Sequence, residues 1–228
     1  MGMADKRQHT ETLRVWDLPT RVFHGLLIAA VCGAVGTALA GALDWHVRFG
    51  LACGALLGFR LVWGLIGGHW SRFRRFACSP VAAWRYLRGR SRPDEAGDVG
   101  HSPLGSLAIV LMLVVLLAQV GTGLVADDEV ATTGPLARFV PDAVTAAATA
   151  WHKSGGQWLI YGLVAMHLIA VAVYTLRGRG IVAAMWHGDK RVPADARWPS
   201  SRDGWAQRVL ALVLLACFAG AATWLAYL

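Results

Sequence analysis

Four histidines lie inside or at the ends of long apolar runs, and these side chains are the ones best suited to chemistry within a membrane. They are His24, His46, His152 and His167. Ionisable residues are costly at membrane depth, and those found there usually serve a function. A single histidine of this kind is equally well explained by a hydrogen bond to a nearby backbone carbonyl, so the four must be considered together.

The depths of these histidines match in two pairs. His24 lies near the start of the first apolar run and His46 near the start of the second, so antiparallel helices would place them at opposite membrane surfaces. His152 and His167 lie fifteen residues apart on a later run, which corresponds to roughly 22 Å of depth along a helix. Depth therefore pairs His24 with His167 near the inner surface, and His46 with His152 near the outer surface.

Two imidazole pairs at two depths favour two haem groups. Imidazole is a standard axial ligand of haem iron. An iron with both axial positions filled has no open site for oxygen or substrate, and it changes redox state with little rearrangement. A zinc site would need three or four close nitrogen, sulfur or carboxylate ligands, and we find no such cluster. We therefore predict electron transfer and assign no catalytic residue.

The cysteines and the remaining cations refine this prediction. The four cysteines form no C-x-x-C pair and no C-x-x-C-H motif, so the haem would not be attached through thioethers. Haem propionates need cationic or hydrogen-bonding partners, although most basic residues near a membrane surface are explained by topology alone. The candidates on the inner side are Arg14, Arg21 and Arg60, and those on the outer side are Arg48 and Lys153.

Two further patterns have an alternative structural explanation. Gly50, Gly54 and Gly58 follow His46 at intervals of four residues. Such a row of glycines either clears a helix face for a flat macrocycle or forms a small-residue stripe for helix packing. The other histidines lie in the tail and the polar loops, where we expect a solvated surface; they are His9, His69, His101 and His187.

Five apolar runs must position these residues. The chain of 228 residues is 56% hydrophobic and only 16% charged, whereas a typical soluble domain has about 25% charged residues. Each run is long enough to cross about 30 Å of hydrocarbon as a helix. We predict an all-α integral membrane protein, a four-helix haem-binding bundle with a fifth C-terminal transmembrane helix. The predicted spans are Val22–Leu43, Trp45–Ile66, Pro103–Ala126, Trp151–Leu176 and Arg208–Leu228.

The division of the chain follows from these spans. We expect a cytoplasmic N-terminal tail (1–21), a four-helix core (22–176), a cytoplasmic or interfacial segment (177–207) and the fifth helix (208–228). Two connecting segments have the amphipathic pattern of helices lying on the membrane surface, Ser79–Arg90 and Gly180–His187. The outer loop Gly134–Ala150 is expected to form a short covering helix.

The basic residues predict the orientation. Nineteen of the 22 lysines and arginines lie in the N-terminal tail and in the segments 60–92 and 177–208. By the positive-inside rule, the N-terminus of this multi-pass protein is cytoplasmic and the C-terminus lies on the outer face. The net charge of +8 then reflects contact with anionic lipid headgroups. We expect no nucleic acid partner, because no recognition motif accompanies the basic residues.

Several short motifs resemble the bacterial cytochrome b561 family, which includes the haem-b membrane subunits of nickel–iron hydrogenases. The resemblance covers about residues 13 to 191. Its motifs are RVWDLPTRVFHG from Arg14, WHVRFG from Trp45, FRLVWGLIGG from Phe59, GHSPLG from Gly100, the Trp151-His152 pair, AMHLIAV around His167 and AMWHGDKR from Ala184. The chain departs from the family in its fifth span and in carrying His187 where small residues are commoner.

This resemblance implies a four-helix core with two haem b groups, and it places the ligands on the same four histidines. It also implies a location in the bacterial inner membrane, with the C-terminus in the periplasm. It further implies a quinone substrate and, at the outer face, a periplasmic dehydrogenase, hydrogenase or c-type cytochrome. We accordingly expect an electron-transfer subunit between the quinone pool and a periplasmic redox partner. The alternatives are a stand-alone oxidoreductase that couples a small species such as superoxide to quinone, and a haem or ion transporter. An anchoring role and an oligomeric state are also open at this point.

Overall fold

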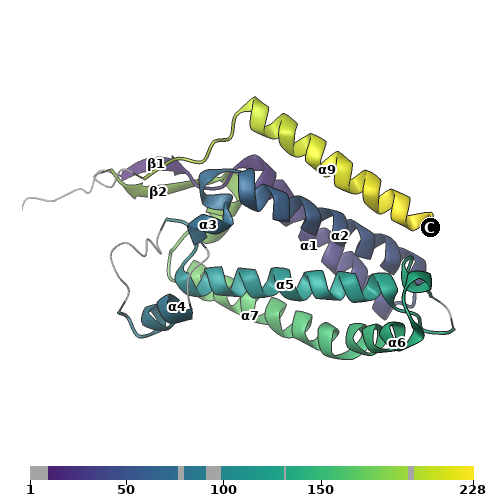
Figure 1. Ribbon diagram of the computed structural model, residues 1–228. Helices are drawn as coiled ribbons and strands as arrows, with labels where there is room; N and C mark the ends of the chain where they lie inside the picture. Colours follow the sequence, from purple (N-terminus) through teal and green to yellow (C-terminus); the bar gives the residue numbers. More distant parts are fainter. Residues whose placement is uncertain (1–9, 77–79, 91–98, 131, 195–197) are drawn as a thin grey trace, which may run out of the picture.

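The computed structural model describes residues 10–76, 80–90, 99–130, 132–194 and 198–228 (Figure 1). Each of its long helices is apolar enough to cross a membrane. The predicted five spans and the all-helical membrane fold are therefore confirmed. The long helices are α1 (Leu18–Leu39), α2 (Leu43–Ile66), α5 (Pro103–Val125), α7 (Gly156–Leu176) and α9 (Trp205–Ala226).

A buried carboxylate caps the start of α1. The helix begins at Leu18, four residues before the predicted start at Val22. Asp17 is fully buried and caps the helix by accepting a hydrogen bond from the Thr20 backbone N–H at 2.8 Å. The same carboxylate accepts bonds from the Gly68 N–H at 2.9 Å, the Ser71 hydroxyl at 2.8 Å and the Trp63 indole N–H at 3.2 Å. Asp17 thus joins the start of α1 to the end of α2, seven residues before His24.

The fourth span begins nine residues earlier than predicted. The helix α6 (Asp142–Ala150) continues through a π-helical turn, η3 (Trp151–Gly155), into α7. The expected covering helix in the outer loop is therefore the first part of the fourth span. A π turn accommodates an extra residue in a helix and often marks a functional position, and this one contains His152.

The fifth helix, α9, belongs to the bundle. It packs on α2, next to α1, while α5 pairs with α7 and contacts α2 (Figure 1). A Cβ added at Gly58 would lie 2.5 Å from the Phe218 ring of α9, and one at Gly54 would lie 3.2 Å from Val120 of α5. Two of the three glycines after His46 therefore serve helix packing, whereas Gly50 has nothing within 4 Å.

A two-stranded antiparallel sheet ties the N-terminal tail to the segment before α9. Its strands are β1 (Thr10–Arg14) and β2 (Asp189–Pro193), and β2 follows the short helix α8 (Ile181–His187). Short helices also follow α2 and precede α6: η1 (His69–Ser71), α3 (Phe73–Phe76), α4 (Pro80–Leu87) and η2 (Ala137–Phe139). Ser79, the first residue of the predicted interfacial segment, lies outside the described residues. Val81 and Trp84 of α4 are exposed, as expected for an interfacial helix.

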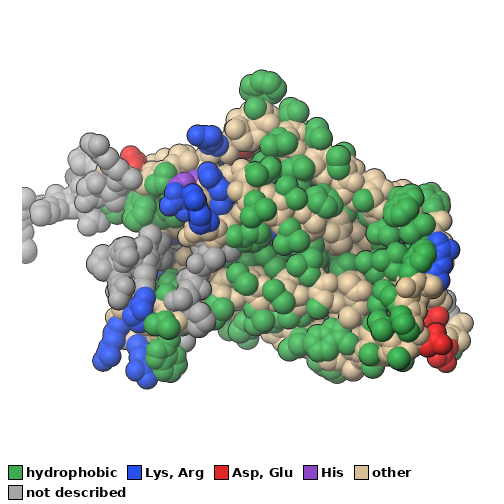
Figure 2. Space-filling model, viewed as in Figure 1, with side chains coloured by type: hydrophobic (Ala, Val, Ile, Leu, Met, Phe, Trp, Pro, Cys, Tyr) green, Lys and Arg blue, Asp and Glu red, His purple; other side chains and the backbone are tan. Residues whose placement is uncertain are grey.

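The two ends of the bundle carry opposite charges. Lysines and arginines gather at the end that holds the sheet, α3 and α4, and the visible acidic side chains gather mainly at the end near α6 (Figure 2). Apolar side chains cover the surface between these ends (Figure 2). This surface is typical of a protein that spans a bilayer with its charges in the two headgroup regions.

Candidate functional site

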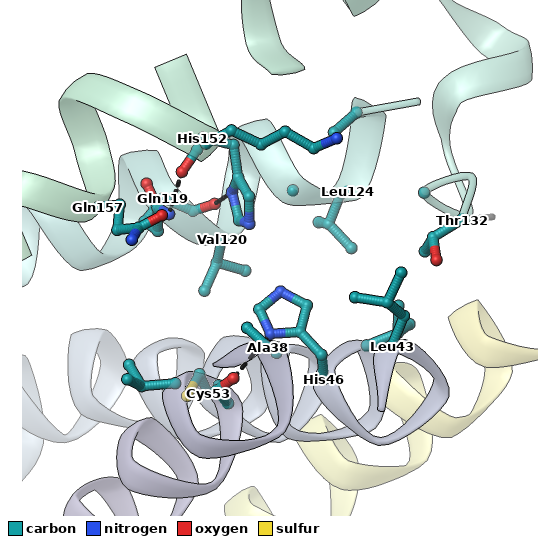
Figure 3. Close-up of a pocket in the computed structure, with 18 of the residues that line it drawn as sticks. Ala38, Leu43, His46, Cys53, Gln119, Val120, Leu124, Thr132, His152 and Gln157 are labelled. Atoms are coloured by element: carbon teal, nitrogen blue, oxygen red, sulfur yellow. Dashed lines mark hydrogen bonds between the residues drawn. The ribbon is translucent and has the colours of Figure 1, made fainter. Parts of the chain in front are cut away.

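His46 and His152 face each other at the end of the bundle near α6. His46 lies on the first turn of α2 and His152 in the π turn η3. Their ring centroids are 5.9 Å apart, and the ring planes are inclined by 77°. Figure 3 shows the two rings pointing toward one another across a cavity. The structure thus brings together the outer pair that depth had selected.

Hydrogen bonds to backbone carbonyls orient both rings. His46 Nδ1 lies 2.8 Å from the Ala34 carbonyl, and His152 Nδ1 lies 2.9 Å from the Gln119 carbonyl. Because a carbonyl oxygen only accepts, each Nδ1 must carry the proton, and each Nε2 keeps its lone pair. In Figure 3 the bonded nitrogens lie away from the gap, so the Nε2 atoms face it. This is how proteins orient histidines that ligate metals.

Gln119 of α5 holds His152 from two sides. In addition to its backbone bond, its side-chain amide donates to the His152 backbone carbonyl at 2.9 Å. Backbone bonds in a π turn run from i to i+5, and this amide adds a side-chain bond that ties the turn to α5. Gln119 was not among the predicted site residues. A polar amide in the middle of an otherwise apolar run was the signal that could have identified it.

A cavity of about 410 Å³ lies between α1, α2, α5 and α7 and contains both histidines. Its volume is within the range of about 300–1,000 Å³ that is usual for small-molecule and cofactor sites. Two glycines of its lining keep it open: Gly50 has nothing within 4 Å, and a Cβ at Gly123 would lie 2.7 Å from the His152 ring. Gly123 was also missed, because a glycine in an apolar helix gives no distinct sequence signal.

His24 and His167 form the second pair, nearer the basic end. They lie on α1 and α7, with ring centroids 6.5 Å apart and planes inclined by 61°. Both rings are partly buried. The structure therefore also brings together the predicted inner pair.

The spacing of both pairs fits a single metal ion held between two axial imidazoles. With metal–nitrogen bonds of about 2 Å on each side, and about 1 Å from each ligand nitrogen to its ring centroid, the centroids would lie roughly 6 Å apart. The observed separations are 5.9 Å and 6.5 Å. No group of three or more histidine, cysteine or acidic side chains gathers as a metal site in the described part of the chain. The pairs thus fit a planar metal chelate that needs only two protein ligands.

The three inner candidates for propionate binding already contact protein groups. Arg14 forms ion pairs with Asp189 and Asp203, at 2.6 Å and 3.0 Å. Arg21 donates to the Trp186 backbone carbonyl. Arg60 is buried, with its guanidinium 4.7 Å from the centre of the Phe73 ring. Their role toward propionates stays a prediction.

The two outer candidates have different surroundings. The Arg48 guanidinium lies 4.9 Å from the centre of the Trp45 ring. Lys153 lines the cavity and forms an ion pair of 3.6 Å with Asp128, which lines it too. Of the two, Lys153 is the one whose position suits a propionate of a group held between His46 and His152.

His101 differs from the expected solvated surface position. Its ring lies 4.6 Å from that of Trp16, and its Nδ1 atom is buried. Burial lowers the pKa of His101 to about 3, and the charges of Arg60 and His24 add to the effect. The sequence places His101 among polar residues outside the spans, but its ring packs against Trp16, next to the start of α1. His187 is exposed as expected, His69 is partly buried, and His9 lies outside the described residues.

One of the comparisons with known proteins gave a match. A family model described as prokaryotic cytochrome b561 matches residues 15–188, which include all four paired histidines. Neither the curated proteins nor the solved structures gave a match.

Proposed function

The chain belongs to the prokaryotic cytochrome b561 family and is a membrane b-type cytochrome of electron transfer, and from this premise we propose that it holds two haem b groups, one near each membrane surface. The two imidazole pairs at opposite ends of the bundle support this proposal. His24 and His167 would ligate the inner haem, and His46 and His152 the outer haem. When bound, haem supplies one-electron redox chemistry.

The protein's own groups suit that role. The carbonyls of Ala34 and Gln119 keep the outer rings oriented and make each Nε2 a better donor, because the proton on Nδ1 is hydrogen-bonded. With both histidines of a pair bound to it, a haem iron would have no open site for oxygen or substrate. His152 and His167 differ by fifteen positions, so the two sites lie roughly 22 Å apart along η3 and α7. Electrons would therefore cross most of the bilayer between them.

We further propose an orientation and two redox partners. The basic end, which includes β1, would face the cytoplasm of a bacterial cell, and the C-terminus of α9 would face the periplasm. The inner site would exchange electrons with membrane quinone near His101 and Arg60, because His101 interacts electrostatically with both Arg60 and His24. The outer site would exchange them with a periplasmic c-type cytochrome or redox enzyme subunit.

Reconstitution tests the function directly. The purified chain would be placed in vesicles whose bilayer contains a quinol, with ferricyanide outside as a membrane-impermeant oxidant. We expect two haem b per chain, reduced by the quinol and reoxidised by ferricyanide. A single haem, or haem that dissociates on washing, would contradict the proposal, and the latter would instead favour a haem transporter. Sustained superoxide oxidation with quinone alone would favour a stand-alone oxidoreductase.

Replacing Gln119 should affect the outer haem alone. In Gln119→Leu the His152 carbonyl loses its amide partner, and the π turn that positions the ring loses a constraint. Second-shell substitutions of this kind typically weaken metal binding about 10–100-fold. We therefore expect faster loss of one haem and a changed electron paramagnetic resonance signal for it, with the other signal unchanged.

Gln157→Leu is the matched control for this variant. Gln157 lines the same cavity but hydrogen-bonds the Tyr161 hydroxyl at 3.2 Å instead of touching a paired histidine. Its replacement should leave both haem signals as they are. Equal effects of the two substitutions would show that Gln119 acts only through cavity polarity.

A further inference from the structure

A second pocket lies at the basic end of the bundle, between the end of α2 and the start of α9. Its volume is about 240 Å³. Trp63, Ile66 and Leu210 form an apolar wall, and Arg72 and Arg202 supply positive charge. The pocket is separate from the paired histidines and contains none of the residues assigned to haem.

The two arginines of this pocket are not neutralised by the protein. In the described part of the chain, neither guanidinium has a carboxylate within ion-pair distance, and the Nε atom of Arg72 is buried without a hydrogen-bond partner. The nearby carboxylate of Asp203 is bonded to Arg14 and Arg208 instead. Two guanidinium groups without an acidic partner favour an anion, and a phosphate group in particular matches their donor geometry.

The surface next to the pocket favours an apolar tail on that anion. Along α2 and α9, Leu65 is 70% exposed, Ile66 53% and Val213 54%. Figure 2 shows lysine and arginine side chains beside the start of α9 and apolar side chains along the helices beyond them. Cationic groups thus lie at the membrane surface and apolar groups lie deeper. A phospholipid, with an anionic headgroup and apolar acyl chains, matches this arrangement. A free phosphate would leave the apolar wall uncovered.

We propose that this pocket binds the phosphodiester headgroup of an anionic phospholipid, with Arg72 and Arg202 on the phosphate. The acyl chains would lie along the seam between α2 and α9. The side chain of Gln207 lines the pocket as well and adds a neutral hydrogen-bonding group for the glycerol part. Basic pockets between transmembrane helices recognise lipid headgroups in this way. A bound lipid would also bridge the end of α2 and the start of α9, which line the pocket.

Native mass spectrometry of the full chain, released from a neutral detergent, would test this site. The probes are phosphatidylglycerol, phosphatidylcholine of the same acyl chains, and inorganic phosphate. We expect one phosphatidylglycerol to be retained preferentially. Arg72→Gln and Arg202→Gln should each weaken its binding roughly five-fold, given the usual contribution of one basic residue near a charged headgroup.

Arg75→Gln is the matched control, because Arg75 lies on the neighbouring helix α3, is exposed and does not line the pocket. It should leave phosphatidylglycerol binding unchanged. Arg202 is also exposed, so its variant remains informative if Arg72→Gln fails to fold. Equal retention of the two lipids, or an equal loss in the control, would overturn the proposal. Competition by inorganic phosphate at the same concentration as the lipid would show a free-anion site instead.

Discussion

Replacing His46 by alanine should reduce the haem content from two to one per chain, and replacing His152 should remove the same haem. The two imidazoles face each other at 5.9 Å, and no group of three or more histidine, cysteine or acidic side chains gathers as a metal site in the described part of the chain. An alanine leaves one axial position empty and a larger cavity. The pyridine haemochrome assay would give the stoichiometry, and redox titration would identify which haem remains.

His24→Ala and His167→Ala should remove the other haem. The double variant His46→Ala/His152→Ala should then retain one haem, whereas His46→Ala/His24→Ala should retain none. His101→Ala is the control, because His101 lies near His24 but its ring packs against Trp16 at 4.6 Å. If His24→Ala and His46→Ala removed one and the same haem, the pairing would be wrong.

The pairing was accessible from the sequence because helix geometry converts residue number into depth. A fixed rise per residue and alternating helix directions leave only one arrangement of His24, His46, His152 and His167 in which partners share a level. The family motifs lie on the same helices, and the match over residues 15–188 agrees with them. Apolar runs of this length have only one fold available in lipid, which is why the helical bundle was also predictable.

The features that the sequence did not reveal depend on contacts between distant residues. Asp142–Ala150 is not apolar enough to stand out as a membrane span, yet it extends the fourth helix because the π turn around His152 lets the helix continue. The contribution of Gln119 depends on a carbonyl 33 positions away. Strands β1 and β2 pair residues that are 175 to 183 positions apart, and no local pattern predicts such a pairing. His101 was misplaced for the same reason, since only the folded chain brings it to Trp16.

Substituting Asp17 by alanine should destabilise the protein more than any substitution of a surface charge. The carboxylate is fully buried and accepts hydrogen bonds from Thr20, Gly68, Ser71 and Trp63. Alanine leaves these donors without an acceptor, at about 1–3 kcal/mol for each one that water cannot reach. Even if only two remain unsatisfied, the midpoint of thermal unfolding should fall by roughly 10 °C. It would be measured in detergent by tryptophan fluorescence.

Asp189→Asn is the matched control for this result. Asp189 also lies at the basic end and forms an ion pair with Arg14 at 2.6 Å, but its side chain is 34% exposed. Exposed ion pairs of this kind contribute about 0–1 kcal/mol to stability. Asp17→Asn should lie between the two variants, because its amide oxygen still caps α1 while its NH₂ group faces donors. Since Asp17 fixes the start of the helix that carries His24, heating Asp17→Ala should release the inner haem before the outer one. Equal midpoints for Asp17→Ala and Asp189→Asn would show that the four hydrogen bonds contribute little to stability.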